Sequence, residues 1–229
     1  MSTNTPIKDI RTMGVVLRRT NYGESDRILN VLTSEGKFTV IAKGVRKAKS
    51  KLAGGIEMFS LIDFNFHFGR SEMGVVTGAK MVSYYSEILK DFERMELAGM
   101  ILKMTGRVAE SSDSPDYFKI VKQCLECLND GVGNTLIESW FLLNLYLAGG
   151  EEVNLYRDAK GEKLSADLKY NWDIANEAFL ESDCGEYGAD EIKLLRLMCT
   201  TDLKTMRRVK VSEEMYEKVL KIARAATHI

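Results

Sequence analysis

Hydrophobic and polar residues alternate through the first eighty residues, a pattern that indicates strands rather than helices. The alternation is clearest in SLIDFNFHF, where every second residue from Ile62 to Phe68 is apolar. A period of two places these side chains on one face of a half-buried strand. Four further runs have strand character: RTMGVVLRRT, ILNVLT, KFTVIAKG and MGVVTGAKMV. Between the second and third of these, Ser34-Glu35-Gly36 predicts a hairpin with Gly36 at positive φ.

A helical period replaces this alternation near Tyr84, and Pro and Gly become few. The pattern predicts helices over residues 86–110, 116–130, 135–150, 190–208 and 212–229. In the first of them we expect one apolar stripe, formed by Ile88, Phe92, Met95, Ile101 and Leu102. Ser212 is the expected N-cap of the last helix.

The fold class that follows is multi-domain α+β. Five short strands with no helix among them, and with basic residues on the surface, are typical of an OB-fold β-barrel. We place this barrel in residues 1–80 and an all-α helical domain in residues 81–229. Residues 151–188 are polar and irregular, and we interpret them as an insertion in the helical domain.

Charge is divided unevenly between the two parts. Residues 1–80 hold 13 Lys and Arg against 7 Asp and Glu, a net +6, whereas residues 81–229 hold 19 against 26, a net −7. A basic segment of this kind suggests a polyanionic partner. Chance variation in surface charge is the alternative.

The basic residues concentrate in AKGVRKAKSKLAGG, between two predicted strands. Five cations and no acid occur within nine residues: Lys43, Arg46, Lys47, Lys49 and Lys51. Cations that meet phosphates release condensed counterions, which gives an affinity that falls with salt. With the barrel pattern beside it, we favour phosphate binding over a loop kept basic for solubility.

Three further arginines, Arg18, Arg19 and Arg70, are candidates to extend this surface. Each one taken alone is more often a solvated cation at a strand end. Phe64, Phe66 and Phe68 share one face and fit either a base-stacking platform or barrel core. Core is the commoner role for a consecutive alternating set.

The sequence offers no catalytic constellation. Its two histidines, His67 and His228, form no nucleophile–base set, and no phosphate-binding GxxxxGK[ST] motif occurs. Cys124 and Cys127 form a CxxC inside a predicted amphipathic helix, where packing is the usual role. We therefore expect neither an enzyme nor a metal or other cofactor. The N-terminus has no apolar signal region, so we expect a cytoplasmic protein.

The order of these motifs resembles the RecO family of bacterial recombination mediators. The resemblance is carried by the YGESDR turn, the AKGVRKAKSKLAG loop and the strand SLIDFNF, and more weakly by LAGMILKMTGRVAE, FLLNLYLAGG and the closing helices. It implies an OB-fold and a helical domain. It also implies a non-enzymatic role in DNA repair and recombination: binding single- and double-stranded DNA, annealing strands, and helping RecA displace single-strand DNA-binding protein.

The resemblance also implies partners and a location. RecR is the usual partner, single-strand DNA-binding protein is held by its acidic, apolar-tipped C-terminal tail, and RecA is affected indirectly. A nucleoid-associated protein of the cytoplasm is expected. The loop cations Lys43 to Lys51 become the best candidates for DNA contact, whereas Arg27 in YGESDR fits a brace of the turn equally well.

One departure from the family concerns zinc. Many RecO proteins carry a four-cysteine zinc site after the long apolar helix, but here residues 151–188 contain only Cys184. We therefore predict no structural zinc, and we expect Leu155, Tyr156, Trp172 and Phe179 to form a small core instead.

A function of another class stays open from the residues. An OB-type adaptor would bind proteins rather than DNA, with its basic loop against an acidic tail. Binding of a bare oligonucleotide separates the two.

Overall fold

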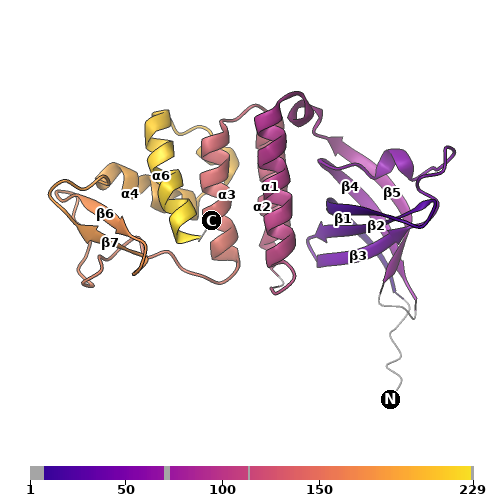
Figure 1. Ribbon diagram of the computed structural model, residues 1–229, viewed down its shortest axis with the longest axis horizontal. Helices are drawn as coiled ribbons and strands as arrows, with labels where there is room; N and C mark the ends of the chain where they lie inside the picture. Colours follow the sequence, from indigo (N-terminus) through magenta and orange to yellow (C-terminus); the bar gives the residue numbers. More distant parts are fainter. Residues whose placement is uncertain (1–7, 70–72, 113, 228–229) are drawn as a thin grey trace, which may run out of the picture. The chain divides into compact units, whose positions relative to one another are not determined.

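The computed structural model describes residues 8–69, 73–112 and 114–227, and it divides the chain into two units (Figure 1). The first unit, Met1–Asn129, contains a barrel and two helices, and the second unit is Asp130–Ile229. The predicted domain change between residues 80 and 81 lies inside the first unit and stays a prediction. Among the described residues, no helix has the length and apolarity needed to cross a membrane.

Five strands form the predicted closed barrel, in the order β1-β2-β3-β5-β4 with β4 returning to β1. The strands are β1 (Lys8–Tyr22), β2 (Asp26–Thr33), β3 (Gly36–Ala42), β4 (Ser60–Phe68) and β5 (Gly74–Tyr84). All neighbours are antiparallel except β3 and β5, which are parallel and joined by two residue pairs, Val40 with Gly74 and Ile41 with Val75. The β-barrel and the helical region that follows confirm the predicted α+β fold class.

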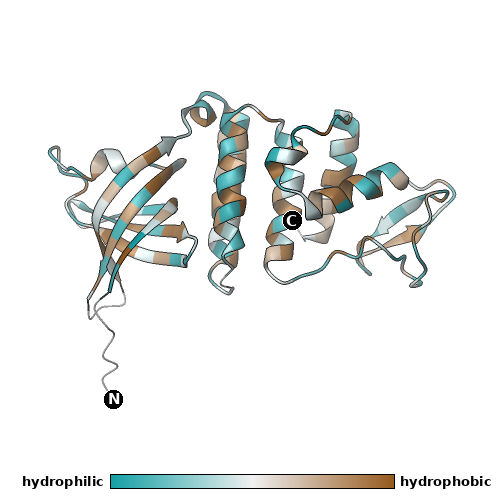
Figure 2. Cartoon of the chain, turned by 180° about the vertical axis from the view of Figure 1, so that it is seen from behind, coloured by the Kyte–Doolittle hydropathy of each residue, from teal (hydrophilic) through white to brown (hydrophobic). Residues whose placement is uncertain are grey.

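Alternation along the strands fills the barrel, as the banding of hydrophobic and hydrophilic residues in Figure 2 shows. Phe64 and Phe66 of β4 are almost fully buried, and their rings stack with centroids 5.1 Å apart. Phe38 and Phe68 pack against the same core and contact each other at 5.6 Å. The hairpin glycine Gly36 has φ +113°, as its turn position predicted.

The two helices of the first unit are α1 (Phe92–Val108) and α2 (Asp116–Asn129), after the short 3₁₀ turn η2 (Ser86–Lys90). The predicted stripe on α1 is wrong in part. Phe92 and Met95 are exposed, whereas Leu97, Ala98, Ile101, Leu102 and Thr105 are buried. The helix begins only at Phe92, after its cap Asp91, so Ile88 lies in the separate turn. Phe92 and Met95 belong to the exposed first turn of α1, and burial begins at Leu97.

The second unit contains α3 (Asn134–Ala148), α4 (Ala189–Thr200), α5 (Leu203–Met206) and α6 (Glu213–Ala226). Ser212 caps α6 as predicted, because its side chain accepts a hydrogen bond from Met215 N–H. The single helix predicted over 190–208 is instead two helices. Asp202 starts the second by accepting from Thr205 N–H, and Trp140 Nε1 donates to the carbonyl of Thr201 at the break.

The segment 151–188 is more ordered than predicted, because it contains a hairpin of β6 (Tyr170–Asp173) and β7 (Ala178–Glu181). The helical domain is therefore not all-α. Phe179 is fully buried and lies edge-on to three aromatic rings, those of Tyr170, Trp172 and Tyr187, at 5.1 to 6.2 Å.

Of the four residues expected in this small core, Trp172 and Phe179 contact each other and Leu155 is buried, but Tyr156 is exposed. Tyr156 is 62% exposed, and its ring lies 4.6 Å from the guanidinium carbon of Arg196. That guanidinium also donates to the Leu155 carbonyl at 2.7 and 2.9 Å. Leu155 is therefore buried, whereas its neighbour Tyr156 packs on the arginine at the surface.

Candidate nucleic-acid interface

The loop between β3 and β4, residues 43–59, carries the basic cluster and is anchored by apolar side chains. Val45 and Ile56 are buried in the barrel core, and Leu52, Ala53 and Met58 pack against it. Gly55 lies so close to β5 that a Cβ there would come within 2.5 Å of the Ala79 carbonyl oxygen. Apolar anchors near both ends therefore fix the path of the loop.

The turn between β1 and β2 braces the same loop by hydrogen bonds. The Asp26 carboxylate accepts from Gly44 N–H at 2.7 Å, and Ser25 O accepts from Arg46 N–H at 2.9 Å. The Gly44 hydrogen bond lowers the pKa of Asp26, with smaller contributions from Ser25 and from the charges of Lys43 and Lys47. Sequence reasoning missed this role of Asp26, for which the only signal was its place in YGESDR.

The five cations of the loop all have exposed side chains: Lys43, Arg46, Lys47, Lys49 and Lys51. Arg46 also donates from Nη1 to the Gly23 carbonyl at 3.2 Å. Within the described part of the chain, none of the five forms an ion pair within 4 Å. Their charge is therefore directed at solvent, where an anionic ligand can reach it.

The arginines proposed to extend this surface have different environments. Arg19 forms an ion pair with Glu57 at 2.9 Å, at the β4 end of the loop. Arg18 is exposed but lines a cavity beside α1. Arg70 lies outside the described residues. Arg27 donates to Asn21 Oδ1 at 3.2 Å, across the first hairpin, which is the bracing role considered for it.

The aromatic residues of β4 belong to the core. Phe64 and Phe66 are buried and Phe68 is half-buried against Phe38, so their rings do not form an open platform. His67, on the other face, pairs with Asp9 at 2.7 Å. A nucleic acid could therefore interact with this part of the barrel through charge, but not by stacking its bases on these rings.

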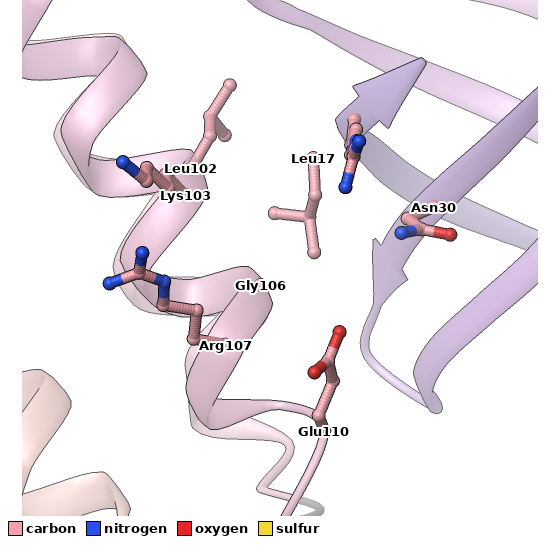
Figure 3. Close-up of a pocket in the computed structure, with 8 residues that line it drawn as sticks. Leu17, Asn30, Leu102, Lys103, Gly106, Arg107 and Glu110 are labelled. Carbon is pink, nitrogen blue, oxygen red and sulfur yellow. The ribbon is translucent and has the colours of Figure 1, made fainter. Parts of the chain in front are cut away.

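A second cationic region lies between the barrel and α1 (Figure 3). A cavity of about 390 Å³ is lined by Leu17, Arg18, Asn30, Leu102, Lys103, Gly106, Arg107 and Glu110. Lys37 reaches the same place from β3, because its Nζ donates to Glu110 Oε1 at 3.0 Å and to the Gly106 carbonyl at 3.3 Å.

Two of the four cysteines are positioned for packing. Cys124 and Cys127 are buried within α2, and burial raises the pKa of the Cys124 thiol well above its usual value. Burial also raises the pKa of Cys199 to about 11. Such thiols stay protonated and are poor metal ligands. Across the described residues, no group of three or more His, Cys, Asp or Glu side chains is arranged to hold a metal ion.

Comparison with known proteins decides the family. The family model described as Recombination protein O N terminal matches residues 7–85, and the one described as Recombination protein O C terminal matches residues 89–227. The chain belongs to the RecO family. The short interval between the two RecO matches, residues 86–88, lies within η2.

Individual RecO proteins are similar over most of their length. The chain is 26% identical over 216 residues to the DNA repair protein RecO of Dehalococcoides mccartyi, covering 90% of this chain and 85% of that protein. It is 28% identical over 212 residues to the DNA repair protein RecO of Roseiflexus sp., covering 88% and 74%. That of Rubrobacter xylanophilus is 30% identical over 142 residues, covering 61% and 57%. This chain is accordingly a RecO-family DNA repair protein.

Proposed function

We propose that this RecO-family protein binds single- and double-stranded DNA without reading sequence, anneals complementary strands, and helps to load RecA onto DNA covered by single-strand DNA-binding protein. The observation that carries the proposal is the basic loop. It holds five exposed cations on a backbone anchored by Val45 and Ile56. A fixed cationic loop loses little conformational entropy when it meets a phosphate backbone.

Annealing follows from electrostatics alone. Two DNA strands repel each other through their phosphates, and cations placed beside them lower that repulsion. Lysine side chains contact phosphates and do not recognise bases, so complementary strands of any sequence can be annealed. No bond is made or broken in this process, which fits a mediator rather than an enzyme.

For the protein partners we propose RecR and the acidic, apolar-tipped tail of single-strand DNA-binding protein, with RecA acted on indirectly. A cavity of about 520 Å³ in the second unit has suitable chemistry for the tail. Arg207 and Arg208 supply positive charge at its wall, and the half-buried Val132 and Val209 supply apolar surface. Arg207 is already paired with Asp130 at 2.9 Å, so Arg208 is the better partner for a carboxylate.

The salt dependence of binding tests the DNA-binding part of the proposal. The variant K47A/K49A/K51A removes three exposed cations and leaves the anchors Val45 and Ile56 in place. We expect weaker binding to single-stranded oligonucleotides of any sequence. The slope of log affinity against log salt should fall by about 2, since each lost phosphate contact with a single strand removes about 0.7.

A charge-matched control separates the loop from net charge. K90A/K119A/K193A also removes three cations, each paired with an acid on its own helix or turn. Fluorescence anisotropy should show a slope close to that of the unmodified protein. Equal slopes in the two triple variants would remove the loop from the site. If an acidic peptide bound the loop while an oligonucleotide did not, the adaptor function would be the correct one.

A further inference from the structure

The cavity between the barrel and α1 owes its shape to an irregularity in β1. Val16 pairs with Val31 and Arg18 pairs with Asn30, so Leu17 is an extra residue in the ladder. A bulge of this kind redirects side chains. It places both Leu17 and Arg18 toward the cavity, whereas strict alternation would send one of them into the barrel. Figure 3 shows Leu17 between its strand and α1.

The cavity has an excess of positive charge. Arg18 comes from β1, and Lys103 and Arg107 lie four residues apart on α1, hence on one face of that helix. All three side chains are exposed, and none has an ion pair within the described part of the chain. The one acid in the wall, Glu110, is paired with Lys37. Three uncompensated cations therefore converge on one cavity.

The chemistry of the wall favours phosphates over other anions. Guanidinium groups bind phosphate oxygens in a fork, and a lysine adds a point charge. The apolar residues offer little surface to an apolar side chain, because Leu17 is 6% exposed and Leu102 is 1% exposed. The wall holds no aromatic ring on which a base would stack. This combination fits a sugar–phosphate backbone better than a peptide with an apolar tip.

The cavity and the basic loop lie on different sides of the barrel. Both views of the chain show the loop after β3 on the side away from α1, and the cavity lies against α1 (Figures 1 and 2). A short stretch of backbone on one surface therefore leaves the other surface free. Two strands can be held at the same time, each beside its own cluster of cations.

We propose that the groove formed by Arg18, Lys103 and Arg107 is a second DNA-backbone site, which holds one strand while the basic loop holds the other. The proposal rests on the proposed function, because it assigns a second surface to the annealing activity. The occupant is the phosphate backbone of a single strand. Fixation of α1 to the barrel by Lys37 keeps the groove in place.

The test compares the binding of one strand with the pairing of two, in the full chain. We expect K103A/R107A to keep the affinity for a single oligonucleotide within about twofold, measured by fluorescence anisotropy at a protein excess. We expect its annealing rate for two labelled complementary strands to fall by about tenfold and to depend less steeply on salt, since two phosphate contacts are lost. K90A/K119A, which removes the same charge outside the groove, should anneal at the unmodified rate.

Direct occupancy is read from the methyl signals of Leu17 and Leu102. A thymidine oligonucleotide should shift them in the unmodified protein and in K47A/K49A/K51A, but not in K103A/R107A. Shifts caused only by an acidic peptide would overturn the proposal, as would equal annealing rates for K103A/R107A and K90A/K119A. If the unmodified protein bound no oligonucleotide at all, the proposed function itself would fail. If the protein bound the oligonucleotide but annealed strands equally fast without Lys103 and Arg107, only the proposal of a second site would be overturned.

Discussion

The two long connections of this chain, residues 43–59 and residues 151–188, keep their shape by different means. The first places its apolar residues against the barrel beneath it, into which it inserts Val45 and Ile56. The second carries its own core, in which Phe179 contacts three other aromatic rings. The first therefore leaves its polar surface free for a ligand, whereas the second directs its largest side chains into its own packing.

The comparison shows what holds residues 151–188 together, a segment that contains a single cysteine. A four-cysteine site would join distant parts of 151–188 through one ion. Here the parts of the segment are connected by a two-stranded hairpin and an aromatic cluster. In addition, the Asp158 carboxylate accepts hydrogen bonds from the N–H groups of Lys160 and Glu162 at 2.9 and 2.8 Å. Burial of these aromatic rings stabilises the segment, and its one cysteine, Cys184, is exposed.

The largest loss of stability is expected in residues 151–188, which have their own core. Phe179→Ala removes a fully buried ring, and we expect a loss of about 3–5 kcal/mol in the free energy of unfolding. Chemical denaturation checks the value. Leu180→Ala is the matched control, because its side chain is 43% exposed and its loss should cost about 0.5 kcal/mol or less. Similar losses in the two variants would show that the cluster is not the core of this segment.

A smaller loss of stability is expected in residues 43–59, which are anchored in the barrel core. Val45→Ala removes two buried methyl groups, and we expect a loss of about 2 kcal/mol. It leaves every cation of the loop in place. Affinity for a single-stranded oligonucleotide should nonetheless fall, because the loop must then be ordered on binding. An unchanged affinity in a measurably destabilised Val45→Ala protein would mean that the anchoring of the loop has no part in binding.

The brace of the loop should respond to acid. The Gly44 N–H hydrogen bond lowers the folded-state pKa of Asp26 below its ordinary value near 3.8. Its stabilising contribution is therefore complete above the unfolded-state pKa and is lost as pH falls through the folded-state pKa. We expect Asp26→Asn to lower stability at neutral pH and to flatten the fall in stability below about pH 4. Identical acid profiles with and without the carboxylate would contradict this role.

The smallest effect is expected for the exposed ring in the second connection. Tyr156→Ala removes the contact with Arg196 and leaves the guanidinium bound to the Leu155 carbonyl. Since cation–π contacts at exposed sites contribute about 0.5–1 kcal/mol, the loss of stability should not exceed that range. Thermal unfolding of Tyr156→Ala and Tyr156→Phe tests it, because phenylalanine keeps the ring and should behave like tyrosine.

Local patterns of the sequence predicted the five strands of the barrel, because alternating apolar residues are a signal carried by neighbouring residues. The turn at Gly36 was likewise predicted from three adjacent residues, Ser34-Glu35-Gly36. The placement of the basic cluster on a connection between strands followed for the same reason. The stripe expected on α1 was wrong at Phe92 and Met95, which lie in the exposed first turn of the helix, after its cap Asp91. The strands of the 170–181 hairpin are four residues each, too short for a periodic signal.

The second cationic region was out of reach of the sequence for a different reason. Arg18 is next to Arg19, and nothing local distinguishes them. The register between β1 and β2 separates them, sending Arg18 to the cavity by α1 and Arg19 to Glu57. A register depends on two strands at once, and the partners on α1 are more than eighty residues away in the chain.

The short parallel join between β3 and β5 has a consequence for the basic loop. Only two residue pairs close the barrel there, and Lys43 follows two residues after the second of them, Ile41. A clasp of this length opens more readily than the long antiparallel ladders around the rest of the wall. Opening at this join would loosen the strand end from which the basic loop starts, and amide exchange along β3 and β5 would report how often it occurs.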